Sequence, residues 1–214
     1  MNFVISYSCG KDSTLALHRM IVDGHTPVGL LVMINEDMDR SWFHGVDLEL
    51  LQAIADSLNI PLILCRSKGQ EYHIGFEKGL KEAIHNGATA CVFGDIDIAD
   101  NAKWCKDRCD AVGIESIFPL WQEDRIDIVN EVLDLGYSCI IKCVRNQDLP
   151  AEVLGKSLGE VIDIMMERNI DICGENGEYH TIVLDGPIFN KPANFQCLET
   201  IDFGNISAIN IVKA

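Results

Sequence analysis

Short apolar runs alternate with stretches of helical periodicity over the first 121 residues, and this alternation constrains the fold more than any other feature. Strands joined through helices of about ten to fifteen residues lie parallel, because the chain returns to the same end of the sheet before each strand begins. The pattern therefore predicts an α/β fold built on a doubly wound, five-stranded parallel sheet. The predicted strands are 2–7, 27–35, 61–65, 90–93 and 115–121.

Residues 8–13, Ser-Cys-Gly-Lys-Asp-Ser, stand between the first predicted strand and a helix that begins near Ser13. A strand, a tight turn and a helix start leave unpaired backbone N–H groups at the positive end of the helix dipole, which suits anionic oxygens. Lys11 adds a positive charge, and Ser8 and Ser13 add hydroxyl donors. The Walker A pattern is absent, so we predict a phosphate-binding loop of another type.

A second polar turn, Gly94-Asp95, follows the fourth predicted strand. In the common strand order (third, second, first, fourth, fifth), the first and fourth strands are neighbours whose connections leave in opposite directions. A crevice then opens at their carboxyl ends, between residues 8–13 and Gly94-Asp95. Val32 and Met33, near the end of the second strand, are predicted to belong to the same nucleotide site.

The pattern changes at Glu123. We predict a nucleotide-binding domain at 1–122 and a smaller substrate-binding α/β lobe at 123–214, with strands near 138–144, 182–184 and 208–212. Within this lobe, residues 174–181 read Gly-Glu-Asn-Gly-Glu-Tyr-His-Thr. So many polar residues and glycines are poor core material, and the segment is predicted to be a flexible turn that presents polar groups to a ligand.

Composition excludes several classes of protein. The balance of 17 basic against 33 acidic residues gives a net charge of -16, which repels nucleic acid in the absence of a basic cluster. Nine cysteines, an odd number at irregular spacing, indicate free thiols in a reducing cytoplasm. The N-terminus leads straight into the first strand without a basic region, and no apolar run approaches the length of a membrane span, so neither export nor a membrane partner is expected. The sequence marks no oligomer interface, and a homodimer stays open.

Two motifs carry a resemblance to a known family. Residues 8–13 resemble the Ser-Gly-Gly-Lys-Asp-Ser loop of the N-type ATP pyrophosphatases (PP-loop superfamily), with Cys9 at the first glycine. Residues 174–181 are similar to the Gly-Glu-Gly-Gly-Glu-Tyr/Phe-x-Thr segment of the diphthine-ammonia ligases, with Asn176 at a family glycine. Supporting matches are Gly94-Asp95-Ile96, Trp104, Pro119-Leu120-Trp121 and Asp185-Gly186-Pro187.

The resemblance implies an adenine nucleotide alpha hydrolase-like fold and an ATP-dependent ligase. A substrate carboxylate would attack the α-phosphorus of ATP and release pyrophosphate, and ammonia from ammonium would open the acyl-adenylate. The implied acceptor is the carboxylate of diphthine on elongation factor 2, and the implied cofactors are ATP and Mg²⁺. A Cys9 side chain must then point away from the phosphates.

The resemblance also implies roles for individual residues. The residues implied to bind the nucleotide are Ser8, Cys9, Gly10, Lys11, Asp12, Ser13, Val32, Met33, Gly94 and Asp95. The implied catalytic residues are Lys11, Asp12, Glu175, Glu178 and His180, with Glu178 foremost and Asp12 as a Mg²⁺ ligand. The residues implied to face the acceptor are Asn176, Gly177, Tyr179 and Thr181.

Alternatives stay open at this point. Residues 98–103 lack the Tyr-Gln-Arg stretch of archaeal and eukaryotic members, so the acceptor could be another small-molecule carboxylate. A nucleotide sensor without turnover is a second alternative. A tRNA-thiolating enzyme is a third, but it requires paired reactive cysteines and a basic surface, whereas Cys105 and Cys109 fit helix packing. The remaining histidines, including His44, are expected to contribute nothing to a site.

Overall fold

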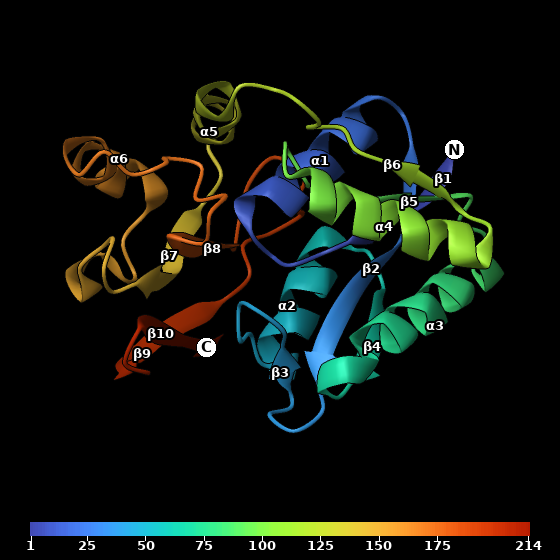
Figure 1. Ribbon diagram of the computed structural model, residues 1–214, viewed down its shortest axis with the longest axis horizontal. Coiled ribbons are helices and arrows are strands. Elements are labelled where there is room, and N and C mark those ends of the chain that lie inside the picture. The colour runs from blue at the N-terminus through green and yellow to red at the C-terminus, as the bar shows by residue number, and fades with distance from the viewer.

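The structure is a computed structural model that describes residues 1–214, and two lobes lie side by side in it (Figure 1). The N-terminal lobe contains the strands β1 (Asn2–Ser6), β2 (Thr26–Asn35), β3 (Arg40–Ser41), β4 (Leu62–Ser67), β5 (Ala90–Val92) and β6 (Glu115–Ile117). Its helices are α1 (Lys11–Val22), α2 (Leu48–Leu58), η1 (Gly69–Glu71), α3 (Tyr72–His85) and α4 (Ala99–Val112). The C-terminal lobe contains α5 (Arg125–Asp134), β7 (Cys139–Arg145), η2 (Ala151–Val153), α6 (Leu158–Glu167), β8 (Tyr179–Val183), β9 (Phe195–Asp202) and β10 (Ile206–Lys213).

The five longer strands of the N-terminal lobe confirm the predicted sheet. They lie in the order β4, β2, β1, β5, β6, and every pair among them is parallel. In chain order these are the third, second, first, fourth and fifth predicted strands, so β1 and β5 flank the point where the connections diverge. The sheet therefore opens a crevice at the carboxyl ends of β1 and β5.

Each face of this sheet is buried against its own pair of helices. Phe3 and Ile5 of β1 pack in a core of 44 buried residues with α1 and α2, and this core continues into the C-terminal lobe. Val4 points to the opposite face, into a core of 14 buried residues with α3 and α4. Alternate residues of one strand thus enter two cores, as expected for a strand covered on both sides.

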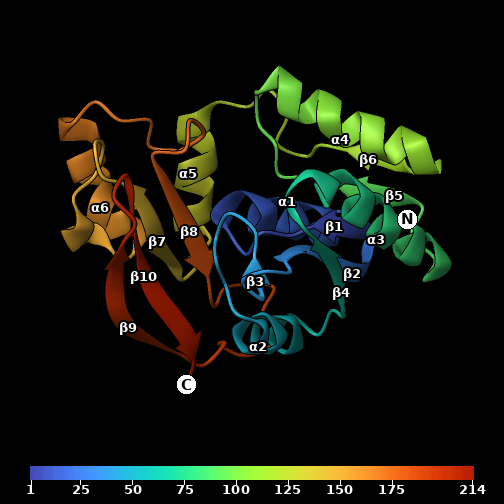
Figure 2. The same cartoon turned by 60° about the horizontal axis from the view of Figure 1, so that its bottom comes forward.

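The C-terminal lobe is a four-stranded antiparallel sheet in the order β8, β7, β10, β9 (Figure 2). Its strand β8 lies at the edge nearest to α1 of the N-terminal lobe. Arg19 of α1 ties the lobes together through Glu123, at 2.7 Å from Nη2 to Oε2, and through Glu131, at 3.2 Å from Nε to Oε1. The edge strand β8 lies against the loop that precedes α1, where the N–H of Val183 donates to the carbonyl of Cys9 at 2.8 Å.

Several predicted boundaries need correction. The fifth strand ends at Ile117 rather than at residue 121, because the chain turns around Pro119. The segment 174–181 is not one flexible turn, since its last three residues already belong to β8. Two strands were missed: β3 has only two residues, and β9 is exposed along nearly its whole length, so neither shows a buried apolar pattern.

Candidate active site

A cavity of about 620 Å³ lies at the carboxyl edge of the parallel sheet, and both lobes contribute to its wall. The ends of β1, β2 and β5 supply one side, and the segment that leads into β8 supplies the other. Most of the predicted site residues line it. These are Ser8, Lys11, Asp12, Ser13, Val32, Met33, Gly94, Asp95, Glu175, Gly177, Tyr179, His180 and Thr181.

The loop between β1 and α1 has the geometry of an anion-binding turn. Gly10 is the N-cap residue of α1 and has no side chain to occupy the N–H groups of the first helical turn. The hydroxyls of Ser8 and Ser13 share a hydrogen bond of 3.0 Å, and Ser8 Oγ accepts from the N–H of Gly10 at 3.2 Å. Hydroxyls and backbone N–H groups are therefore gathered at one helix start, as in other phosphate sites.

Close packing shapes this loop from two sides. A Cβ on Gly94 would lie 2.7 Å from the backbone nitrogen of Ser13, so only glycine lets β5 approach the loop this closely. Cys9 has φ +66°, a left-handed conformation in which glycine is favoured. Its side chain is 1% exposed and lies in the core, away from the cavity. Burial raises the pKa of the Cys9 thiol far above its usual value, so the thiol stays protonated.

Lys11 is buried at the junction of the lobes, with only 4% of the residue exposed. Its ammonium lies 2.8 Å from Asp12 Oδ2, donates to the carbonyl of Cys173 and sits over the ring of Tyr179 at 5.6 Å. Burial alone would lower the pKa of Lys11, but the negative charge of Asp12 and the neighbouring groups outweigh it and hold the pKa well above the usual value. Lys11 is therefore a permanent cation in the cavity wall.

The two motifs are in direct contact. The N–H of Lys11 donates to Thr181 Oγ1 at 3.0 Å, and the N–H of Val183 donates to the carbonyl of Cys9 at 2.8 Å. Strand β8 thus runs along the phosphate loop, although 170 residues separate Lys11 from Thr181 in the chain. Polar groups of the loop before α1 and of β8 can therefore contact the same ligand.

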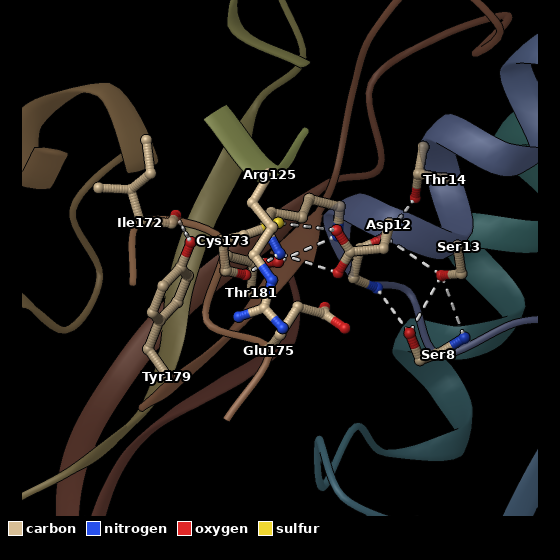
Figure 3. Close-up of polar contacts among 12 residues, drawn as sticks. Ser8, Asp12, Ser13, Thr14, Arg125, Ile172, Cys173, Glu175, Tyr179 and Thr181 are labelled. Carbon is tan, nitrogen blue, oxygen red and sulfur yellow. Dashed lines mark hydrogen bonds and ion pairs between the residues drawn. The ribbon is translucent and has the colours of Figure 1, made fainter. Parts of the chain in front are cut away.

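Three potential metal ligands converge beside Lys11. One side-chain atom each from Asp12, Cys173 and Glu175 lies within 4.8 Å of the other two. Figure 3 shows Asp12 between these residues and the serines of the phosphate loop. Burial and the charge of Asp12 raise the pKa of Glu175 to about 7. Burial likewise raises the pKa of Asp95, which also lines the cavity. Crowded carboxylates of this kind are stabilised by a cation.

Arg125, at the start of α5, holds this carboxylate cluster in place. It forms an ion pair with Asp97 at 2.6 Å and a second with Asp171. Asp171 in turn accepts from the N–H of Cys173 at 2.9 Å and from the N–H of Glu175 at 3.3 Å. Arg125 is drawn at the centre of the close-up in Figure 3. Arg125 was not predicted as a site residue, because one arginine at a helix start carries no spacing signal.

The structure corrects the expected placement of Glu178 and Asn176, which do not line the cavity. Glu178 is 7% exposed, and its carboxylate accepts from the backbone N–H of Asn176 at 3.0 Å and from its side-chain amide at 3.2 Å. The carboxylate folds back because it satisfies the donors of the tight turn that contains Gly177, whose φ is +80°. Glu178 shapes the turn, and its oxygens face away from the ligand space.

Other cavity residues were not predicted. His44 was expected to contribute nothing, yet it is 8% exposed and lines the cavity next to His180. An aromatic wall formed by Trp42, Phe43, Tyr72 and Trp104 closes the side beyond Met33, with ring centroids of Tyr72 and its neighbours 5.7 to 6.1 Å apart. Trp42 and Phe43 come from a loop, Tyr72 from the start of α3 and Trp104 from within α4, so no sequence pattern marks the four together, although Trp104 is one of the supporting family matches.

The cysteines of the chain are unpaired, as predicted. All nine cysteines are free thiols, and eight of them are buried. Both Cys105 and Cys109 pack in the smaller core under α4. No helix has the length and apolar character needed to cross a bilayer.

The fold and the cavity together define a doubly wound α/β protein with a phosphate loop at the switch point of its sheet. Residues 1–116 match the diphthamide synthase N-terminal domain, and residues 124–214 match the diphthamide synthase C-terminal domain. The chain belongs to the diphthamide synthase family.

Its curated relatives carry one name. The diphthine–ammonia ligase of Schizosaccharomyces pombe is 28% identical over 86% of this chain, which spans only 34% of that relative. The diphthine–ammonia ligase of Danio rerio is 25% identical over 94% of this chain and 89% of the relative, and that of Rattus norvegicus is 26% identical over 86% and 79%. A predicted subunit of tRNA methyltransferase from Methanocaldococcus jannaschii aligns over 90% of this chain and 99% of that structure at 14% identity, with a TM-score of 0.48.

Proposed function

We propose that this protein is an ATP-dependent ligase that adenylates a carboxylate, releases pyrophosphate and converts the carboxylate to an amide with ammonium. The observation that carries the proposal is the contact between the phosphate loop and β8, through Lys11 and Thr181 at 3.0 Å. By family membership the first acceptor to test is diphthine on elongation factor 2, which the relatives' name points to. The division at residue 123 into nucleotide and acceptor parts belongs to the same proposal.

The phosphate loop would hold the departing pyrophosphate. Ser8 and Ser13 supply hydroxyls, Asp12 and Ser13 supply backbone N–H groups in the first turn of α1, and Lys11 supplies charge. Because these donors are already gathered before a ligand binds, they stabilise the negative charge of the leaving group at little cost in reorganisation. Attack of the acceptor oxygen forms the bond to the α-phosphorus, and the bond to the bridging oxygen of pyrophosphate breaks with its electron pair.

The carboxylate cluster fits Mg²⁺, which prefers oxygen ligands. Asp12 uses Oδ2 to pair with Lys11, while Oδ1 faces the Cys173 side of the cluster, where Glu175 also lies. Burial, with the charge of Asp12 next in importance, raises the pKa of Glu175 to about 7 even beside Lys11, which supports a place for a further cation there. We assign Asp12 and Glu175 as the residues that would hold the ion, which would neutralise charge on the phosphates of ATP. The Cys173 thiol is a poor ligand for so hard a cation.

The adenosine end of ATP would lie toward Val32 and Met33, at the carboxyl end of β2. The aromatic wall next to Met33 gives this side of the cavity flat apolar surfaces on which a purine can stack. The acceptor would then approach from the side of Tyr179 and Gly177. The second step forms the carbon–nitrogen bond, breaks the carbon–oxygen bond to AMP, and yields one amide, one AMP and one proton from one ammonia.

A different small carboxylate is the second candidate acceptor, and one observation favours it. The family arginine expected near residues 98–103 is absent, and of the residues there only Asn101 lines the cavity. No arginine lines the cavity at all. The neutral side-chain amide of Asn101 can form hydrogen bonds with an acceptor but cannot form an ion pair with the acceptor's carboxylate.

Product analysis tests the proposal. The protein would be incubated with ATP, Mg²⁺, ammonium chloride and elongation factor 2 that carries diphthine, taken from fission yeast without its own ligase. We expect AMP and pyrophosphate in equal amounts, together with amidated factor. Formation of ADP and phosphate, or the absence of turnover with diphthine and with a panel of small carboxylates, would contradict it.

A further inference from the structure

His44 and His180 form a pair of imidazoles at the junction of the phosphate loop and β8. Their ring centroids are 4.8 Å apart, with an angle of 44° between the rings, and both residues line the cavity. His44 comes from the N-terminal lobe and His180 from the C-terminal lobe. The pair therefore exists only when the two lobes are assembled.

The loop that carries His44 is built to hold this ring. Phe43 and Gly45, on either side of it, have φ values of +63° and +60°. Ser41 fixes the base of the loop, since its Oγ accepts from the N–H of Val46 at 2.9 Å. A left-handed aromatic residue is strained, and strain of this kind persists where the surrounding structure requires it.

Hydrogen bonding fixes the tautomer of His44. Its Nδ1 lies 2.9 Å from the carbonyl oxygen of Thr181, and because a carbonyl only accepts, Nδ1 carries the hydrogen. Nε2 of the neutral ring is then an acceptor, and no group of the protein donates to it. The ring also packs on the phosphate loop, since a Cβ on Gly10 would lie 2.9 Å from its Cε1.

Both imidazoles remain uncharged at neutral pH. Burial, with the neighbouring His180 next in importance, lowers the pKa of His44 to about 3, and burial also lowers the pKa of His180. The charge of Lys11 acts in the same direction on both rings. A neutral acceptor close to a fixed cation favours neutral ammonia over the ammonium ion, whereas a carboxylate would favour ammonium, which has no lone pair with which to attack.

We propose that His44 and His180 form the subsite that holds ammonia, with His44 Nε2 accepting one N–H of the nucleophile. This inference rests on the proposed function and assigns the place of its second substrate. The nitrogen keeps its lone pair for the carbonyl carbon of the acyl-adenylate. As the carbon–nitrogen bond forms, AMP leaves with the electron pair of the broken carbon–oxygen bond, and the nitrogen loses one proton to solvent.

Two substitutions of His44 separate this role from a structural one. In His44→Asn the side-chain amide can replace Nδ1 as donor to Thr181 but has nothing at the position of Nε2. In His44→Gln the amide oxygen can reach the position of Nε2. We expect His44→Asn to raise the KM for ammonium chloride about tenfold, the worth of one hydrogen bond, and to leave the KM for ATP unchanged. His44→Gln is expected to stay within about threefold of the parent protein.

Failure of the inference is distinguishable from failure of the proposed function. Pyrophosphate released on mixing with ATP and acceptor, before ammonium is added, reports adenylation alone. If adenylation persists in both variants but the KM for ammonium stays unchanged in His44→Asn, or rises equally in both, the ammonia subsite is refuted. Thermal melts of both variants and the same assay on His180→Ala, which removes the second imidazole and is expected to raise the KM for ammonium at unchanged KM for ATP, keep the test valid if one variant folds poorly.

Discussion

Lys11 differs from the lysine of an open phosphate loop because it is bound from both lobes before any nucleotide arrives. Its ammonium pairs with Asp12 and donates to the carbonyl of Cys173, while its N–H is held by Thr181. One side chain therefore supplies charge to the cavity and joins the two motifs. At the scale of single residues, Lys11 both provides the positive charge proposed to bind phosphate and makes the contacts that join the lobes.

Substitution of this lysine tests its charge. We expect Lys11→Ala to weaken ATP binding or turnover by about 2–4 kcal/mol, since a charge-assisted contact in a water-poor cleft is lost. Isothermal titration with ATP and Mg²⁺ measures the binding part. Lys103→Ala is the matched control, because Lys103 is 72% exposed and pairs only with Asp107 on the surface of α4. Unchanged ATP affinity and rate in Lys11→Ala would defeat the assignment.

Glu175 makes a prediction about pH. Its pKa is raised to about 7 in the folded protein, above the unfolded value, so its protonated form is the one that folding favours. The stability that this proton provides is complete below the unfolded pKa and is lost as pH rises through about 7. We expect Glu175→Gln to flatten the fall in melting temperature between about pH 5 and 8 in metal-free buffer. An identical pH profile in the parent and the variant would contradict this.

The same substitution tests the metal. With Mg²⁺ present, Glu175→Gln removes one carboxylate oxygen from the ion, so the Mg²⁺ concentration for half-maximal pyrophosphate release is expected to rise about tenfold or more. Glu77→Gln is a suitable control, since Glu77 is paired with Arg108 outside the cavity. An unchanged requirement for Mg²⁺ would place the ion elsewhere.

At the scale of elements, the segment between α6 and β8 is positioned by α5. Arg125, at the start of α5, bonds Asp171, and Asp171 bonds the N–H groups of Cys173 and Glu175. A loop with glycines at 174 and 177, both at positive φ, needs such external bonds to keep one conformation. Arg125 thus positions Glu175 through Asp171, although Arg125 itself does not line the cavity.

Loss of Arg125 is therefore expected to loosen the loop before it affects the fold. Arg125→Ala should increase amide hydrogen exchange in residues 171–177 and lower kcat about tenfold, because a small displacement of positioning groups is costly. Arg66→Ala is the control, since Arg66 and its partner Asp39 are 43% and 62% exposed, and such pairs contribute little. If exchange in residues 171–177 is the same in Arg125→Ala as in the parent, the positioning role is refuted.

How much the sequence could predict also depends on the element. The strands β1, β2 and β5 were predictable because continuous runs of their residues are buried, and α1 to α4 because their apolar residues recur at helical spacing. Strand β9 was not, since almost all its side chains are exposed and only pairing with β10 makes it a strand. Ser8 and Lys11 stand in a local motif, whereas His44 and Arg125 reach the site through tertiary contacts that no spacing records.

At the scale of the whole molecule, the two lobes share one core. The larger cluster of 44 buried residues includes Phe3 of the parallel sheet and Ile182 of the antiparallel sheet. Because residues of both lobes pack in this one core, the walls of the cavity between the lobes form only when both lobes fold together. Burial of this shared core therefore determines both the arrangement of the two lobes and the geometry of the cavity.

This shared core predicts one cooperative unfolding transition. Calorimetry is expected to give a single peak whose calorimetric and van't Hoff enthalpies agree, because most apolar burial is common to both lobes. Two separate transitions would show that residues 1–122 and 123–214 are independent domains joined only at their surfaces.

The central claim is that the phosphate loop binds the β- and γ-phosphates of ATP while residues 174–181, which lead into β8, face the α-phosphorus. A crystal structure with Mg²⁺ and α,β-methylene ATP, which cannot be cleaved between these phosphates, tests it most directly. We predict the β- and γ-phosphates at Ser8, Lys11 and Ser13, and the α-phosphate open toward Glu175 and His180. A nucleotide bound in the reverse direction, or outside the cavity between the lobes, would contradict the account.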